Sequence, residues 1–213
     1  MLSDQGFIES HLAVGHAALV PEVSLYLASA LTPLWLATEA FLEHHNMAPP
    51  YWAFAWPGSE ALAAYILANP HLVAGKRVLD FAAGCGLAGI AAAKAGAAWV
   101  EAADIDPLAC AAIQLNAKHN GVEIGVHGGD LVGQSGDWDV ILTGDVCYEQ
   151  QMALKLMTWF KTLAQRTTVL MADPGRAYKP DNPGQKLAEY TVPTSLELEN
   201  TSTRNVIIYR LFA

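Results

Sequence analysis

Three glycines and two aspartates between positions 80 and 105 have a spacing that suits ligand binding. Gly84, Gly86 and Gly89 give the pattern Gly-x-Gly-x-x-Gly between an apolar run and an Ala-rich run. Glycines at a strand-to-helix turn let the backbone turn tightly and approach a nucleotide closely. Asp104 follows Gly84 by twenty residues, where a carboxylate can accept hydrogen bonds from both ribose hydroxyls. The pattern predicts a nucleotide-binding turn, and the alternative is a tight turn that binds no ligand.

The position of Asp80 bears on which nucleotide would bind. Asp80 stands four residues before Gly84, at the end of the predicted strand. A carboxylate there would repel the pyrophosphate of a dinucleotide, which binds at the start of the following helix. It would attract a cationic ligand, and S-adenosylmethionine offers an α-ammonium group beside its sulfonium and adenosine. The literal glycine spacing keeps a nicotinamide-dependent oxidoreductase as an alternative.

Two further sets of polar residues follow the fourth and fifth predicted strands. Asp145 and Tyr148 lie just after the fourth strand, and Asp-Pro-Gly-Arg at 173–176 follows the fifth. In doubly wound sheets ligands bind at the carboxyl ends of the strands, so we expect Asp145 and Tyr148 to meet a second substrate. The alternative for the first set is an exposed loop with a capping aspartate, and for the second it is a plain turn.

The elements that must position these residues alternate between strand and helix, which predicts an α/β fold with right-handed crossovers and a parallel sheet. Predicted strands cover residues 77–81, 99–105, 122–127, 138–143 and 167–172. Predicted helices cover 87–95, 107–120 and 149–164, with a short helix at 185–188. Two β-rich runs, 189–199 and 205–212, close the chain.

The first fifty residues are predicted to be a helical extension, separate from a domain that spans residues 51–213. Ser3 can cap a short first helix, and apolar residues spaced by three to five between Val23 and Leu42 predict a helix kinked or split at Pro33. Residues 46–58 are expected to form an ordered aromatic-rich loop. Ser59 is the expected N-cap of the next helix, which should end at 69–70.

Composition limits the classes of partner. The chain has 213 residues, 53% of them hydrophobic and 15% charged, which indicates one well-packed domain. Its net charge of −9 disfavours nucleic acid and anionic membranes as partners, and no apolar stretch is long enough for a membrane span. Three widely spaced cysteines and seven histidines show no disulfide framework and no metal-binding spacing, so we expect no metal and a cytoplasmic location. We also expect a monomer.

The pattern Asp-x-x-x-Gly-x-Gly at 80–86 resembles motif I of class I, or seven-β-strand, S-adenosylmethionine-dependent methyltransferases, over about residues 51–213. Asp-x-x-Tyr at 145–148 resembles the motif after strand four in a protein-lysine methyltransferase branch. Trp-Ala-Phe-Ala-Trp-Pro-Gly at 52–58 resembles the aromatic segment that precedes the core in that branch. Together with Asp-Pro-Gly-Arg and the Pro-Glu pair at 21–22, these motifs most resemble the electron-transfer flavoprotein β-subunit lysine methyltransferases.

The resemblance implies a doubly wound, Rossmann-like, seven-stranded and mostly parallel sheet with helices on both faces. It implies S-adenosylmethionine as cofactor, S-adenosylhomocysteine as product, and catalytic roles for Asp145 and Tyr148. Cofactor contacts are then expected at Trp56, Asp80, Gly84, Cys85, Gly86, Asp104, Ile105, Asp130, Leu131 and Gly144.

The implied partner is a protein with an exposed lysine, the flavoprotein β-subunit in this family, with ribosomal-protein lysines as an alternative. Asp173, Arg176 and Tyr178 are expected to bind this substrate. We hypothesise that Arg176 pairs with a group flanking the lysine while Tyr178 packs on its methylene stem. A non-catalytic binding module on the same fold is a further alternative.

Overall fold

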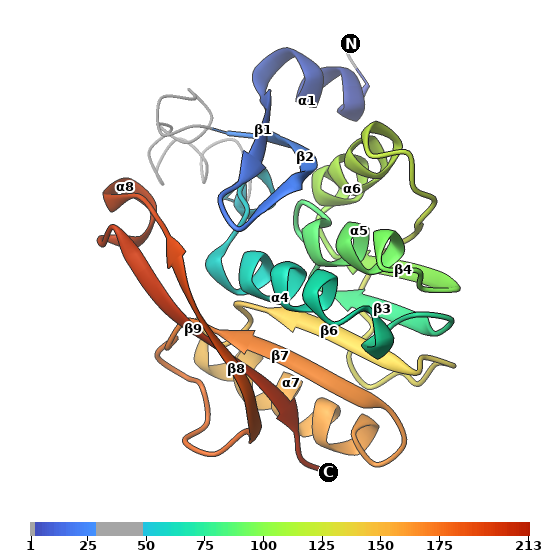
Figure 1. Ribbon diagram of the computed structural model, residues 1–213, viewed down its shortest axis with the longest axis vertical. Helices are drawn as coiled ribbons and strands as arrows, with labels where there is room; N and C mark the ends of the chain where they lie inside the picture. The colour runs from blue at the N-terminus through green and yellow to red at the C-terminus, as the bar shows by residue number, and fades with distance from the viewer. Residues whose placement is uncertain (1–2, 29–48) are drawn as a thin grey trace.

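The computed structural model describes residues 3–28 and 49–213 and contains a central seven-stranded sheet (Figure 1). The strand order is β5-β4-β3-β6-β7-β9-β8, in which only the β9 pairings are antiparallel. The strands are β3 (Arg77–Phe81), β4 (Trp99–Asp104), β5 (Gly125–Gly128), β6 (Val140–Gly144), β7 (Thr168–Asp173), β8 (Gly184–Pro193) and β9 (Thr203–Leu211). This arrangement confirms the predicted doubly wound, mostly parallel sheet.

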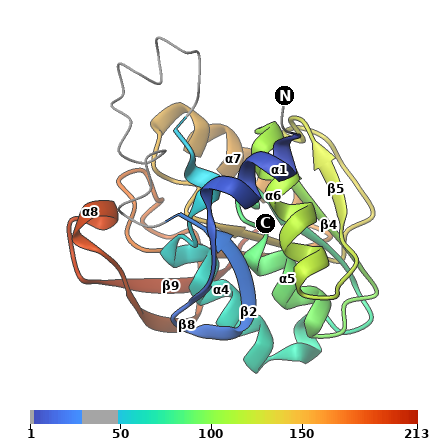
Figure 2. The ribbon, with the colours of Figure 1, turned by 90° about the horizontal axis from the view of Figure 1, so that it is seen from above.

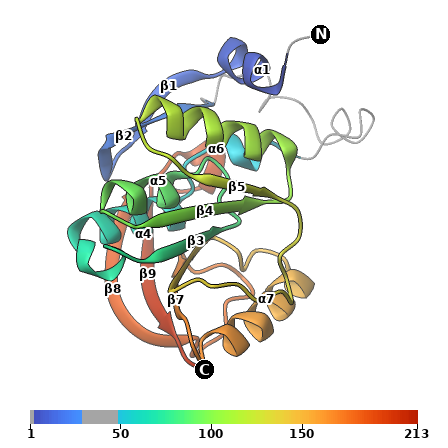
Figure 3. The same cartoon turned by 90° about the vertical axis from the view of Figure 1, so that its right-hand side faces the viewer.

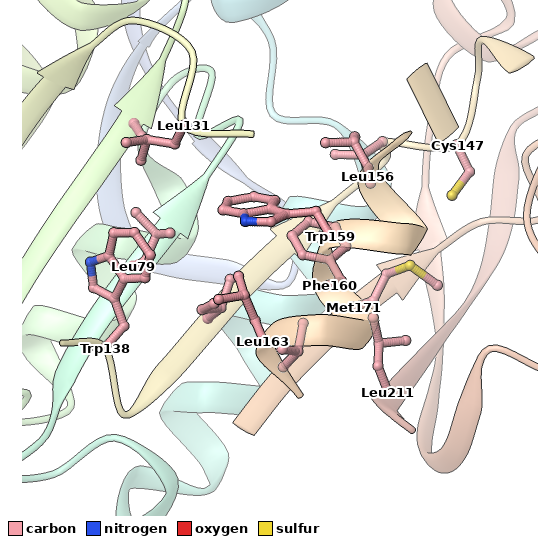
Figure 4. Close-up of a cluster of buried hydrophobic side chains, with 14 of the residues drawn as sticks. Leu79, Leu131, Trp138, Cys147, Leu156, Trp159, Phe160, Leu163, Met171 and Leu211 are labelled. Atoms are coloured by element: carbon pink, nitrogen blue, oxygen red, sulfur yellow. The ribbon is translucent and has the colours of Figure 1, made fainter. Parts of the chain in front are cut away.

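Helices cover both faces of the sheet, as predicted. Helices α4 (Pro57–Ala68), α5 (Leu87–Lys94) and α6 (Pro107–His119) pack on one face, and α7 (Gln150–Leu163) packs on the other (Figures 1 and 3). The middle of β6 and almost all of β7 are buried, because strands covered on both faces must be apolar throughout. Figure 4 shows how Trp159, Phe160 and Leu163 of α7 point at the sheet and fill this side of the core.

The strand order reverses between β3 and β6. From β3 the chain builds outward through β4 to β5, and it then returns to place β6 on the other side of β3. In such sheets the crossover helices leave on opposite sides at this point, and a crevice opens at the carboxyl ends of the two strands. Those ends are Phe81, the second residue of the motif at 80–86, and Gly144, which comes just before the motif at 145–148.

The N-terminal segment differs from the helical prediction. Helix α1 (Asp4–His11) is capped by Ser3 as expected, but β1 (Ala13–Ala17) and β2 (Val20–Leu27) then form an antiparallel hairpin. The predicted helix is therefore wrong over residues 23–27, and its remainder to Leu42 lies outside the described residues. Val23 and Leu25 are both fully buried on one face of β2, so their spacing of two decided the structure.

The hairpin packs over α4, α5 and α6 rather than forming a separate layer of helices (Figure 2). Asn116 on α6 is fully buried, accepts the Tyr26 N–H at 2.8 Å and donates to the Cys85 carbonyl at 2.9 Å. Asn120 likewise bonds both the N–H and the carbonyl of Ser24. Both amides hold the hairpin on α6, and Asn116 also connects it to the glycine turn. The predicted boundary between residues 50 and 51 stays a prediction.

Four smaller predictions also need correction. Residues 185–188 are not a helix but belong to β8, and the four-residue helix α8 (Leu196–Glu199) lies inside the run expected to be strand. The third predicted strand begins at Gly125 rather than at 122. Helix α4 begins at Pro57, with Trp56 rather than Ser59 as its N-cap residue, because proline suits the first helical position.

Candidate active site

A cavity of about 1220 Å³ lies at the carboxyl ends of β3, β4 and β6. This volume is ample for a nucleotide-sized ligand together with an inserted side chain. Its wall is built from the segments that follow those strands, residues 81–85, 103–108, 129–132 and 144–146, and from the aromatic residues Tyr51, Trp52, Phe54, Trp56 and Tyr148.

The glycine turn forms the floor of the cavity. Ala82, Gly84 and Gly86 all have positive φ angles, of 54°, 54° and 81°, so the chain reverses tightly before α5 begins. Gly84 and Cys85 line the cavity, and their contact with a cofactor stays a prediction. Gly86 is instead the N-cap of α5, and a Cβ there would meet Ile113 at 3.2 Å. Burial raises the pKa of the Cys85 thiol to about 12, so it is an uncharged wall group.

Asp104 lies where the prediction places it, on the cavity wall at the end of β4. Its Oδ2 accepts the Gly84 N–H at 2.9 Å and its Oδ1 accepts the Asp106 N–H at 3.0 Å. Each carboxylate oxygen has two acceptor positions, so one on each oxygen is left for a ligand. Burial raises the pKa of Asp104, and these N–H groups oppose the rise. Beside it, the Ile105 side chain is 75% exposed and offers an apolar face.

Asp80 is not among the residues that line the cavity in the described part of the chain. It is 3% exposed, and its Oδ2 accepts the Gly89 N–H at 2.7 Å in the first turn of α5. A Cβ on Gly89 would lie 3.0 Å from that oxygen, so any larger residue would press on the Asp80 carboxylate. Burial raises the pKa of Asp80 to about 7. Asp80 therefore supports the turn from beneath, and its contact with a ligand ammonium stays a prediction.

The remaining predicted cofactor residues, Trp56, Asp130, Leu131 and Gly144, all line the cavity. The Asp130 Oδ1 also accepts the Val132 N–H at 2.8 Å, which is a local turn. Asp130 therefore closes a turn and also lines the cavity, and its contact with a cofactor stays a prediction.

Asp145 is buried at the end of β6, with a φ angle of 59°. Its Oδ2 accepts the N–H of Gly58 in the first turn of α4, and its Oδ1 accepts Nε of Arg176 at 2.8 Å and also Nη2. Three of its four acceptor positions are occupied, and one on Oδ2 is left. Burial raises the pKa of Asp145 to about 6, while Arg176 and the Gly58 N–H oppose the rise.

The other predicted residues separate into two groups. Tyr148 and Arg176 line the cavity, whereas Asp173 and Tyr178 are not among its lining residues in the described chain. Asp173 is buried, and its Oδ1 accepts the N–H groups of Gly175 at 2.7 Å and Arg176 at 2.8 Å. The turn interpretation of Asp173 is therefore correct, and direct substrate contacts of these residues stay predictions.

Three residues that line the cavity or bond to its charged residues were not among the predicted site residues: Tyr51, Gly58 and Glu199. The Tyr51 ring centroid lies 5.9 Å from those of both Trp56 and Tyr148, so three rings gather at the cavity. Tyr51 adjoins the aromatic run and could have been included. Glu199 carried no signal, because its ion pairs with Arg176 and Arg204 depend on tertiary structure.

Across residues 3–28 and 49–213, no helix is long and apolar enough to cross a membrane. The same residues contain no group of three or more His, Cys, Asp or Glu side chains that could hold a metal ion.

Comparison with known proteins identifies the family. A family model described as ribosomal protein L11 methyltransferase matches residues 62–144. The L11 methyltransferase of Aeromonas hydrophila is 56% identical, but over only 50 residues, which are 24% of this chain and 17% of that protein. The electron transfer flavoprotein beta subunit lysine methyltransferase of Danio rerio is 36% identical over 211 residues, which cover 95% of this chain and 81% of that relative. The chain belongs to the latter family.

The electron transfer flavoprotein beta subunit lysine methyltransferases are therefore the family that the motifs predicted. Among solved structures, the magnesium protoporphyrin IX methyltransferase of Synechocystis PCC 6803 aligns with 99% of this chain and 98% of its own, at 16% identity and a TM-score of 0.53. This likeness confirms the Rossmann-like fold.

The cavity residues fit the S-adenosylmethionine that this family of methyltransferases uses. The carboxylate of Asp104 has free acceptor positions for ribose hydroxyls, and exposed Ile105 offers an apolar face to a flat base. Asp130 lies on the same wall, and the glycine turn leaves the backbone open to close approach. The donor and acceptor set thus matches the nucleoside end of this cofactor.

Proposed function

We propose that this protein transfers methyl groups from S-adenosylmethionine to lysine side chains of the electron transfer flavoprotein β-subunit. One observation carries the proposal: Asp104 at the nucleoside end and Asp145 with the three rings of Tyr51, Trp56 and Tyr148 share a single cavity. The name of the family supplies the substrate protein.

When bound, S-adenosylmethionine supplies a methyl group that its sulfonium activates for displacement. Asp104 and Ile105 hold the nucleoside end. The rings of Tyr51, Trp56 and Tyr148 pack on the methylene stem of the entering lysine and exclude water. The free acceptor position on Oδ2 of Asp145 takes a hydrogen bond from the lysine nitrogen and orients its lone pair.

Methyl transfer requires a neutral amine, although a lysine in water has a pKa of about 10.4. Burial in the aromatic cavity favours the neutral form of the amine. Asp145, with a pKa of about 6, is ionised at neutral pH and suits orientation better than strong base catalysis. Burial raises the pKa of Tyr148 above its ordinary value, so its phenol stays protonated and serves as a hydrogen-bond donor or acceptor.

Ribosomal-protein lysines are the second candidate substrate. The observation in their favour is the match of the L11 methyltransferase model to residues 62–144. That range holds the glycine turn, Asp104 and the end of β6, but it omits the Tyr51 and Trp56 rings and Arg176. The match therefore supports the shared cofactor and says less about the substrate.

The test is a methylation assay on purified substrates. The protein is incubated with methyl-labelled S-adenosylmethionine and either the flavoprotein β-subunit or ribosomal protein L11, and mass spectrometry locates the label. We expect label on lysines of the β-subunit, and a large loss of label with Asp145→Asn. Asp137→Asn, at an exposed position outside the cavity, is the matched control. Label on L11 alone would refute the β-subunit as the substrate and make L11 the substrate. A protein that binds nicotinamide dinucleotide but not S-adenosylhomocysteine would refute the methyltransferase activity.

We further propose that the protein acts as a cytoplasmic monomer. All three cysteines are free, which suits a reducing compartment. Sedimentation of the purified protein and fractionation of cells test these two points.

A further inference from the structure

A series of alternating negative and positive side chains extends away from the cavity, beginning at the proposed catalytic carboxylate of Asp145. Arg176 bonds Asp145 through Nε and Nη2, and it bonds Glu199 through Nη1 at 3.0 Å and Nη2 at 2.6 Å. Glu199 in turn accepts Nε of Arg204 at 2.8 Å, and its backbone carbonyl accepts Nη2 of the same arginine. This series of ion pairs therefore joins the end of β6, the turn after β7, α8 and β9.

The guanidinium of Arg176 is directed at these carboxylates by four hydrogen bonds, and its backbone is fixed as well. The Oδ1 of Asp173 accepts the Arg176 N–H at 2.8 Å, which closes the turn that begins at the end of β7. Its guanidinium carbon also lies 5.8 Å from the centre of the Trp56 ring. A side chain held in this way is poorly suited to reach out to a substrate.

The ion pairs of Glu199 are not the solvent-exposed pairs that are common on protein surfaces. Its side chain is only 2% exposed, and a buried carboxylate is retained only where it is paired. Both partners are arginines, and the carboxylate lies across Arg176 from Asp145. Its position explains why Arg176 holds one orientation.

We propose that Arg176 and Glu199 are positioning residues: Arg176 keeps the Asp145 carboxylate ionised and in one orientation at the cavity wall, and Glu199 fixes Arg176. The inference rests on the proposed function for its kinetic consequences only. It also replaces the substrate contact that the sequence suggested for Arg176.

The groups that face Asp145 determine in which direction its pKa should change when Arg176 is replaced. They are the Arg176 guanidinium, the Gly58 N–H at the start of α4, and the more distant Glu199 carboxylate and Cys147 thiol. Arg176 is the cation among them, and an adjacent cation lowers a carboxylate pKa by about one to three units. Its removal should raise the Asp145 titration midpoint from about 6 by that amount.

The first experiment needs no substrate. The aspartates are labelled with ¹³C, the Asp145 resonance is assigned from Asp145→Asn, and its carboxyl carbon is titrated by NMR. The variants are Arg176→Gln, Arg176→Lys and the control Glu189→Gln, whose exposed carboxylate pairs with Lys186. We expect the midpoint to rise by one to three pH units in Arg176→Gln, less in Arg176→Lys, and not in the control. If Arg176→Gln does not fold, Arg176→Lys decides. An unchanged Asp145 midpoint overturns the proposal.

The second experiment measures methyl transfer to the substrate established above. For Arg176→Gln, kcat at pH 7 should fall by about two-fold to one-hundred-fold, the loss of ionised Asp145 that such a shift gives. The deficit relative to wild type should shrink as the pH rises to 9. A deficit that is constant with pH indicates a purely structural role and overturns the proposal. S-adenosylhomocysteine affinity should stay within about two-fold of wild type, because the cofactor ligands are untouched.

Glu199 is tested by a double-mutant cycle. If Glu199 acts through Arg176, the double variant Arg176→Gln/Glu199→Gln should be no slower than Arg176→Gln alone. Additive losses would show that Glu199 acts by another route. A wild-type protein that methylates a different lysine protein refutes the proposed substrate but leaves the Asp145 titration, and so this inference, intact.

Discussion

Replacement of Asp104 by alanine is the most direct test of the nucleoside end of the cavity. The change removes a carboxylate with one free acceptor position on each oxygen, and it also frees the Gly84 N–H that its Oδ2 now holds. A hydrogen bond to a charged group contributes about 1.5–3 kcal/mol. The dissociation constant of S-adenosylhomocysteine should therefore rise by roughly 10- to 150-fold.

Asp104→Asn should also weaken binding, although asparagine is nearly the same size. Both carboxylate oxygens accept backbone N–H groups, from Gly84 and from Asp106. Whichever way the amide turns, its NH₂ group must face one of these donors. Asp104→Asn thus distinguishes whether cofactor binding needs two acceptor oxygens at this position or only a side chain of this size.

Isothermal titration calorimetry with S-adenosylhomocysteine measures these affinities, and thermal unfolding checks that each variant is folded. Asp137→Ala is the control, because Asp137 is exposed and outside the cavity. Unchanged affinity in Asp104→Ala would refute the ribose assignment. A pH series adds a second check: affinity should fall as pH drops through the raised Asp104 pKa, and this loss should be absent from Asp104→Asn.

Three other predictions concern stability. Asn116→Ala leaves the buried Cys85 carbonyl and the partly buried Tyr26 N–H without partners and should lower the unfolding free energy in urea by about 1–4 kcal/mol, whereas exposed Asn205→Ala should have little effect. The ordinary pKa of Asp80 is 3.8, and its pKa in the folded protein is about 7, so the folded protein keeps a proton that the unfolded chain loses in this range. The unfolding free energy should therefore decline as the pH rises from about 4 to 7, and Asp80→Asn should remove up to about 4 kcal/mol of that decline. An identical pH dependence in both proteins would contradict the assignment. Gly89→Ala should lower the melting temperature and S-adenosylhomocysteine affinity together, while Gly15→Ala, which meets only one atom at 4.0 Å, should change neither.

The sequence predicts an element well where local signals agree. The strand at Arg77–Phe81 and the helix that Asp106 and Pro107 begin are both confirmed, because burial, capping and proline placement point to the same structure. The hairpin at 13–27 was missed because the apolar residues of β2 fit a helical spacing as well as an alternating one. Its partner strand decided the outcome, and strand pairing is a tertiary property.

The same difference between local signals and tertiary contacts applies to the candidate active site. The spacing of Asp104 from Gly84 is a property of one strand–helix–strand unit, so its position could be predicted. The bonds from Asp145 to Gly58 and to Arg176 join residues 87 and 31 positions apart. Only the assembled sheet brings them together. Asp145 could thus be placed at the cavity from the sequence, whereas its occupied acceptor positions could not.

The connection between β8 and β9 has a consequence for how this chain can vary. Turns between neighbouring antiparallel strands usually tolerate insertions and deletions, because little depends on their length. Here the connection carries α8 and with it Glu199, which reaches the guanidinium beside the proposed catalytic carboxylate of Asp145. We therefore expect an insertion at residues 194–202 to leave expression and folding largely normal while it impairs turnover. Loop grafting in this enzyme should begin at other turns.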